Sequence, residues 1–335
     1  MRRRVGVVAV VALLVVTLGL VASALRPRTP PPAPASPPGQ GTLAQVGDRM
    51  WRWLGPSECT PAADAVPVER SSNGTWLDAD VPLVNVDSLS FANADDGIAV
   101  GTSSNCARAT AVTRDGGQTW VLSAQSPPML DGVLTDNGVA FGVTRGAQSG
   151  ETLVARYTLR DGRLAPGSGV DGSPVDGSPC DATDGVPTLV AAYSASTVLL
   201  LCQQGPSNGR LLARSVNGGQ FWDRLTDNRP LTGLGGSGTF TRLRVAGTSD
   251  VWVVMQGGGC PEGEIRRSIN SGQTFESLPC PSSAADVSEV FDLAFSDADN
   301  GTLLGLDGNR APVMLTTSDG GQTWTNPRSA ERTRP

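Results

Sequence analysis

Short apolar runs alternate with polar turn signals along most of the chain after residue 42. The run Ile98–Val100 follows the polar segment Asn93–Gly97, and Thr302–Leu304 follows the closely similar segment Asp297–Gly301. Asp or Asn followed by Gly favours a tight hairpin, because Gly tolerates positive φ. Beyond residue 42, no stretch keeps its apolar residues at the 3.6-residue spacing of an amphipathic helix. The pattern therefore predicts an all-β chain built from short strands.

A second signal is an eight-residue segment that recurs four times. It reads almost identically at Thr113–Trp120 and Thr317–Trp324, and more loosely at Ser215–Trp222 and Ser268–Phe275. Its Asp or Asn can accept backbone N–H groups of the turn, its Ser or Thr hydroxyl can add a bond, and its aromatic residue can pack between sheets. We therefore expect a structural rather than catalytic role for Asp115, Trp120, Asn217, Trp222, Asn270, Phe275, Asp319 and Trp324.

The spacing of these segments gives the number of structural units. The Asp or Asn positions are separated by 102, 53 and 49 residues, and a decayed copy, Thr158–Gly162, divides the first gap. A shortened copy at Ser72–Trp76 adds one more unit, so that six units follow one another with a period of about 49 residues. Each unit reads as strand A, a tight turn, strand B, a longer loop, strand C, the repeated turn and strand D. This predicts a six-bladed β-propeller with four-stranded blades, and it leaves open how the ring closes.

The repeated segments resemble the Asp box, or BNR repeat, with the pattern S/T-x-D-x-G-x-T-W. The resemblance covers residues 43 to 325. Over this range the chain is similar to exported bacterial propellers of the photosystem II stability and assembly factor kind, and to the sialidase and sortilin superfamily. It implies a β-propeller and says little about activity, because the box is a folding device. A sialidase would need a tyrosine nucleophile on the face opposite the boxes. Tyr157 and Tyr193, the two tyrosines of this chain, are expected on the box side, which argues against that activity.

The amino-terminal segment predicts export. Arg2–Arg4 precedes the uncharged run Val5–Leu25, which is long enough to span a bilayer, although Ala22–Ala24 could be a cleavage site. We expect a signal anchor or signal peptide at 1–25, a proline-rich linker at 26–42, the propeller at 43–326 and a tail at 327–335. The propeller would then stand outside the cytoplasmic membrane, held by the N-terminal helix or secreted after cleavage.

Six cysteines in an exported chain predict three disulfides. Their places in the repeat favour three pairs: Cys59 with Cys106, Cys180 with Cys202, and Cys260 with Cys280.

Composition narrows the possible chemistry. The chain has no histidine, so a Ser-His-Asp triad and histidine metal ligands are impossible. Its formal charge of -6 disfavours nucleic acid as a partner. The acidic segments lack the spacing of a calcium loop and fit turns better, so we expect no metal and no cofactor.

The strand order assigns each connection to one of two faces. A–B turns and the repeated turns lie on one face, called the repeated-turn face, and the longer B–C and D–A connections lie on the other, called the loop face. One register of the innermost strands carries Ser88, Asp131, Val190, Arg242 and Asp292. We expect Asp131, Arg242 and Asp292 near the channel mouth, either as a binding site or as ion pairs that hydrate the channel.

The leading functional hypothesis is a non-catalytic binding or scaffold propeller that recognises a protein or peptide through its loop face. The alternative is a carbohydrate-active hydrolase that uses Asp131 and Asp292 as paired carboxylates. A purely structural envelope component is a third possibility.

Overall fold

The computed structural model describes residues 39–61, 64–72, 75–123, 129–145, 152–166, 180, 186–203, 210–225, 238–283 and 286–327. The chain divides into two units, Met1–Ser36 and Pro37–Pro335. The predicted signal segment, most of the linker and nearly all of the tail lie outside the described residues. Within the described ranges, no helix has the length and apolar character needed to cross a bilayer.

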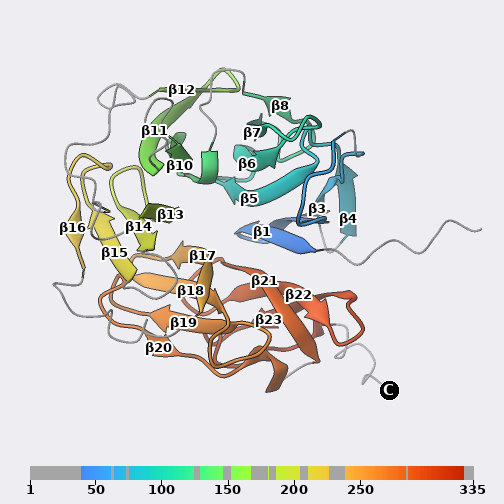
Figure 1. Ribbon diagram of the computed structural model, residues 1–335, viewed down its shortest axis with the longest axis vertical. Helices are drawn as coiled ribbons and strands as arrows, with labels where there is room; N and C mark the ends of the chain where they lie inside the picture. The colour runs from blue at the N-terminus through green and yellow to red at the C-terminus, as the bar shows by residue number, and fades with distance from the viewer. Residues whose placement is uncertain are drawn as a thin grey trace, which may run out of the picture. The chain divides into compact units, whose positions relative to one another are not determined.

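Six antiparallel sheets make up the second unit, arranged as the blades of a propeller (Figure 1). The strands of blades 1 to 3 are β1 (Gln40–Val46), β2 (Arg49–Gly55), β3 (Val68–Ser72), β4 (Thr75–Ala79), β5 (Asn85–Phe91), β6 (Gly97–Thr102), β7 (Arg108–Thr113), β8 (Val121–Leu122), β9 (Met129–Leu134), β10 (Val139–Arg145), β11 (Thr152–Arg160) and β12 (Arg163–Pro166). Those of blades 4 to 6 are β13 (Val186–Ala192), β14 (Val198–Gln203), β15 (Arg210–Ser215), β16 (Asp223–Arg224), β17 (Thr239–Ala246), β18 (Asp250–Gln256), β19 (Glu264–Ser268), β20 (Glu276–Ser277), β21 (Val287–Phe295), β22 (Gly301–Asp307) and β23 (Pro312–Thr317), and a short 3₁₀ turn, η1, covers Pro281–Ser283.

The six-bladed, all-β prediction is confirmed. Blades 1 to 5 have four strands in sequence order, and blade 6 has three strands plus a bridge between Thr316 and Thr325. The first strand begins at Gln40, inside the segment assigned to the linker, because Gln40 and Gly41 pair with Gly55 and Leu54.

Ring closure uses packing rather than an exchanged strand. The innermost strands β1, β5, β9, β13, β17 and β21 follow one another around the axis, and β1 packs against both β5 and β21. Leu43 of β1 is buried with Ala294 and Leu304 of blade 6. In the described part of the chain, blade 1 takes all its strands from the start of the propeller and blade 6 takes its strands from the end.

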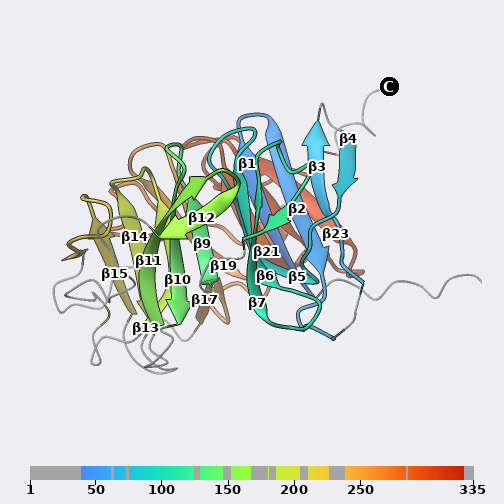
Figure 2. The ribbon, with the colours of Figure 1, turned by 90° about the horizontal axis from the view of Figure 1, so that it is seen from above.

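The two faces are assigned as predicted. Each of four A–B turns accepts a backbone N–H from the repeated turn of the same blade at 2.8–2.9 Å, so both kinds of turn lie on one face. The four N–H donors are Gly116, Gly218, Ser271 and Gly320, and their acceptors are the carbonyl oxygens of Asp95, Ser196, Ser249 and Asp299. Figure 2 shows the strands running between the two faces.

Aromatic packing joins neighbouring blades beneath the repeated turns. Trp51 of blade 1 stacks on Phe91 of blade 2 with ring centroids 3.7 Å apart, and Trp120 meets Phe91 edge-on. The Trp51 Nε1–H also donates to the carbonyl oxygen of Gly116 at 2.8 Å, which ties the turn of one blade to the core of the other. The same arrangement recurs between blades 5 and 6 with Trp252, Phe295, Trp324 and Gly320.

Each repeated turn is held by its own polar side chains. In the first, Thr113 Oγ1 accepts the Gly117 N–H at 2.9 Å and donates to Asp115 Oδ1 at 2.8 Å. Asp115 also accepts the Thr119 backbone N–H at 2.9 Å and its hydroxyl at 2.6 Å. Equivalent bonds to the Asp or Asn oxygen hold the other turns, at Asn217, Asn270 and Asp319.

Replacing Asp319 with alanine should lower the free energy of unfolding by about 1–3 kcal/mol, because turn donors lose their acceptor. Burial by itself would raise the pKa of Asp319, but hydrogen bonds from Thr323 and Thr317 outweigh it and lower the pKa below its usual value. The Asp319 contribution should therefore be present above the unfolded-state pKa and fade as the pH falls through the folded-state pKa. Thermal unfolding across acidic pH measures both effects.

Asp319→Asn is the matched control, since Asn270 fills the same position and donates to Thr274 Oγ1 at 2.9 Å. This variant should keep most of the stability and lose the acid dependence of that turn. An alanine variant as stable as the wild type would contradict the structural role.

The three predicted disulfides are confirmed, and the described residues include no free cysteine. Their Cα–Cα distances are 5.7, 5.6 and 5.6 Å, in the ordinary range for a disulfide. Cys59–Cys106 links blades 1 and 2, Cys180–Cys202 attaches Cys180 to β14 of blade 4, and Cys260–Cys280 closes a loop within blade 5. Three disulfides in one chain are typical of an oxidising compartment outside the cytoplasm.

Candidate functional site

The three candidate side chains lie at one register of the innermost strands. Asp131 of β9, Arg242 of β17 and Asp292 of β21 each come directly after a β-bulge, which shifts the register of the inner strand against its partner. In β13 the bulge lies before Leu189, so Leu189 rather than Val190 occupies this register. The expected alignment was wrong by one residue there, because a bulge leaves no mark in the apolar pattern.

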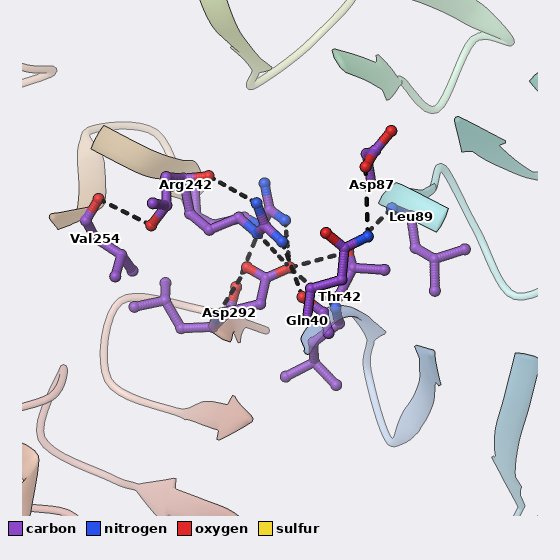
Figure 3. A network of polar contacts seen from close by, with 12 residues as sticks. Gln40, Thr42, Asp87, Leu89, Arg242, Val254 and Asp292 are labelled. Atoms are coloured by element: carbon purple, nitrogen blue, oxygen red, sulfur yellow. Dashed lines mark hydrogen bonds and ion pairs between the residues drawn. The ribbon is translucent and has the colours of Figure 1, made fainter. Parts of the chain in front are cut away.

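Asp292 is the centre of a buried polar network (Figure 3). Its side chain is fully buried, and Oδ2 accepts the Leu43 N–H at 2.9 Å and the Thr42 hydroxyl at 3.0 Å. The same oxygen accepts Arg244 Nη2 at 2.6 Å and lies 3.2 Å from Arg242 Nε. One carboxylate thus joins blade 6 to blade 1, across the closure of the ring, and to blade 5.

Both arginines are also held by backbone carbonyl oxygens. Arg242 donates to the carbonyl oxygens of Gly41 at 2.8 Å and Thr241 at 2.7 Å. Arg244 donates to those of Leu293 at 3.2 Å and Leu243 at 3.0 Å. Less than a fifth of either side chain is exposed. These contacts make the arginines part of the ring closure rather than free cations at a channel mouth.

Asp131 is also buried. It belongs to β9 of blade 3, whereas the network joins blades 5, 6 and 1. Its Oδ2 accepts the Val190 N–H of blade 4 at 2.9 Å. Burial raises the pKa of Asp131, and the Val190 N–H together with the charges of Arg244 and Arg242 opposes this effect. Among the described contacts, no hydrogen bond or ion pair joins Asp131 to Arg242 or Asp292. The structure therefore brings Arg242 and Asp292 into direct contact and leaves Asp131 in a separate position.

This register forms a repeated hydrogen bond between blades. Thr42 accepts the Leu89 N–H at 3.2 Å, as Asp131 accepts Val190 and Asp292 accepts Leu43. In each case a side-chain oxygen on the inner strand of one blade accepts a backbone N–H from the inner strand of the following blade. The N–H belongs to the residue directly after the equivalent register position. Thr42 was not predicted from the sequence, because it fell in the expected linker. Arg244 was not predicted either, although a charged residue on an innermost strand indicates a buried polar contact.

A cavity lies along the axis, between the network and the repeated-turn face. Its volume is about 170 Å³, which is room for several water molecules. All six blades line it, with polar groups from Gln45, Ser90, Asp136, Tyr193 and Arg244. Neither Asp131 nor Asp292 is among its lining residues, so the cavity does not face a pair of carboxylates.

Neither tyrosine is presented as a nucleophile. Tyr157 is buried, and the Tyr193 hydroxyl donates to the Asp250 carbonyl oxygen at 3.2 Å. Burial raises the pKa of both phenols above the ordinary value. A phenolate at neutral pH is therefore strongly disfavoured at both positions.

One group of potential metal ligands gathers among the described residues, at Cys260, Glu262 and Cys280. The two sulfur atoms are bonded to each other, so they are not the thiolates that a transition metal requires. A single carboxylate remains, which does not make a metal site.

No protein-family profile and no curated protein matches the chain. Solved structures do match. A lectin from Aleuria aurantia has a TM-score of 0.53 at 9% identity, over 84% of this chain and 96% of the lectin. A GH74 enzyme from Niastella koreensis has a TM-score of 0.52 at 14% identity, over 87% of this chain and 46% of the enzyme. YCF48 bound to D1 peptide has a TM-score of 0.46 at 17% identity, over 91% and 90%. The lectin and the GH74 enzyme agree in general fold with the six sheets described above, and these sheets define the class: the chain is a six-bladed β-propeller.

Proposed function

We propose that the chain is a non-catalytic propeller that binds a protein or peptide. The supporting observation is that Asp131 and Asp292 form hydrogen bonds between blades. A hydrolase with paired carboxylates needs both groups facing the sugar, one as acid and one as base or nucleophile. Here each carboxylate accepts a backbone N–H of the next blade, and Asp292 also pairs with two arginines. The fold does not decide between binding and hydrolysis, because the similar solved structures include a lectin and a glycoside hydrolase.

The proposed binding surface is the loop face. Arg242 and Arg244 are held at the Asp292 register by the carboxylate and by backbone carbonyl oxygens, so we expect a ligand to contact the loops rather than these side chains. Asn105 and Arg310 are exposed on two of these loops, between β6 and β7 and between β22 and β23. In this proposal the 1–25 segment directs the propeller across the cytoplasmic membrane and either stays as its anchor or is cleaved as a signal peptide.

The test is binding of the full chain to peptide and glycan arrays, together with an assay of glycosidase substrates. We expect saturable peptide binding and no turnover of the sugars. Arg310→Gly removes an exposed guanidinium at a position with φ of 62°, which glycine adopts freely, and should weaken peptide binding about tenfold.

Arg160→Ala is the matched control, because Arg160 is exposed beside the decayed turn on the repeated-turn face. It should bind like the wild type. Sugar hydrolysis that disappears in Asp131→Asn, with no change in melting temperature, would instead establish the hydrolase alternative.

A further inference from the structure

Three corners of the ring are built alike and can be compared. At each, the repeated turn of one blade meets the blade before it: blade 2 on blade 1, blade 4 on blade 3, and blade 6 on blade 5. The glycine N–H of each turn bonds to the carbonyl oxygen of an equivalent residue in the A–B turn. That residue is Asp95 in blade 2 and Asp299 in blade 6, but Ser196 in blade 4.

Two of these corners neutralise an arginine from the preceding blade. Arg49 of blade 1 lies 3.7 Å from Asp95, and Arg267 of blade 5 lies 2.7 Å from Asp250. Each guanidinium also donates to a carbonyl oxygen in the A–B turn of the next blade, at 3.1 and 2.9 Å respectively. The charge of both arginines is therefore satisfied within the protein.

Arg156 of blade 3 occupies the third corner without such partners. It lies against Gly218, where an added Cβ would be 3.7 Å from the Arg156 Cζ. Its Nε is enclosed and has no hydrogen-bond acceptor, and no ion pair or hydrogen bond joins Arg156 to a residue of the described chain. The Nε atoms of Arg70 and Arg214 are enclosed in the same way, so this atom alone does not indicate a site. What indicates one is that no described carboxylate neutralises the Arg156 guanidinium and that Arg156 lines an open concavity.

A concavity of about 390 Å³ opens beside this arginine. Its other polar lining comes from Asn137, Ser194, Ser196 and Asn217, which offer hydroxyl and amide groups. Among the described residues, no carboxylate lines it. A guanidinium among neutral hydrogen-bonding groups suits a carboxylate, which can accept two parallel N–H bonds.

Exposed apolar side chains flank the concavity. Phe221 is 73% exposed and Val216 is 56% exposed, both in the same repeated turn as Asn217. The Phe221 N–H donates to Asn217 Oδ1 at 2.9 Å, which places the Phe221 backbone next to a lining residue of the concavity. At the Phe221 position the other three repeated turns carry Thr119, Thr274 and Thr323. An aromatic residue in so open a place is typical of an interaction site rather than of the turn.

We propose that the corner of blades 3 and 4 is a docking surface for a peptide segment in which one Asp or Glu side chain stands beside a large apolar residue. Arg156 receives the carboxylate, and Phe221 with Val216 packs on the apolar neighbour. The net charge of -6 disfavours a polyanionic partner, so a single carboxylate fits best. This surface is on the repeated-turn face, opposite the loop face, and does not depend on the function proposed above.

The test uses the full chain and short acetylated, amidated peptides that carry one Asp or Glu beside Leu or Phe, with Asn or Gln versions as the matched probes. Fluorescence anisotropy should show about tenfold tighter binding of the acidic peptides. Arg156→Gln should abolish that preference. Asn217→Asp and Phe221→Thr should each weaken binding about tenfold with little change in melting temperature, because they copy Asp115 and Thr119 of the first repeated turn.

Three results would overturn the proposal: equal binding of acidic and amide peptides by the wild type, wild-type affinity in both Asn217→Asp and Phe221→Thr, or preference for basic peptides. Loss of binding in Arg310→Gly alone would assign the peptide to the loop face. Loss in the Asn217 and Phe221 variants, with Arg310→Gly unaffected, supports this surface and counts against the loop face.

Discussion

Asp292→Ala is expected to lower the free energy of unfolding by about 3–5 kcal/mol, because removing one partner of a buried ion pair leaves the others uncompensated. Arg242 and Arg244 would lose their shared carboxylate, and the Leu43 N–H would lose its acceptor. These groups belong to blades 5 and 1, so the loss should fall on the closure of the ring. Urea unfolding followed by tryptophan fluorescence measures the change.

Hydrogen exchange locates the effect of that substitution. Amides of β1 should exchange faster in Asp292→Ala, whereas those of β10 and β11, on another side of the ring, should change less. Asp136→Ala is the control, because Asp136 is exposed in an A–B turn, and its effect should stay within about 0.5 kcal/mol. If Asp292→Ala unfolds within about 1 kcal/mol of the wild type, packing alone closes the ring.

The number of blades could be predicted because turn chemistry is local. An Asp or Asn that accepts N–H groups four residues ahead, with a glycine between, needs no distant partner, so the turn leaves its signature in the sequence wherever it occurs. The disulfide pairs followed in the same way. Once the period was known, Cys59 and Cys106 could be placed at equivalent positions of neighbouring blades, and the two cysteines of each remaining pair lay close in sequence around one blade.

The role of the polar register could not be predicted in the same way. A carboxylate on an innermost strand can face the channel or the next blade, and the difference depends on the bulge before it and on the neighbour across the gap. Asp292 meets Thr42 and Leu43, which are about 250 residues away in the chain. Thr42 follows the proline-rich segment, and that composition hid the start of β1.

The corner at Arg156 shows a different limit. The loss of the usual aspartate and threonine in the Ser215–Trp222 turn is visible in the sequence as Asn217 and Phe221. Its consequence is not visible, because Arg156 lies in another blade and only the ring places it against Gly218.

Glu264→Gln is expected to cost about 3 kcal/mol near neutral pH. Glu264 Oε1 accepts Arg266 Nε and the Ser277 hydroxyl, both at 2.7 Å, and Oε2 accepts the Gly259 N–H at 2.7 Å. Burial opposes ionisation, but these bonds prevail and lower the pKa of Glu264 to about 2 from 4.5. At about 1.36 kcal/mol for each pKa unit, the shift corresponds to the stated loss.

The sign of the pH dependence follows from the same shift. The folded state binds the Glu264 proton more weakly than the unfolded state, so the stabilisation is complete above about pH 4.5 and disappears as the pH falls toward 2. Urea unfolding at neutral and at acidic pH should show this loss in the wild type and a smaller loss in Glu264→Gln. Glu276→Gln is the control, because Glu276 is exposed on β20. A Glu264→Gln variant with the full acid sensitivity of the wild type would show that other carboxylates govern acid unfolding. The loop closed by Cys260–Cys280 would then be held by its disulfide and not by this carboxylate.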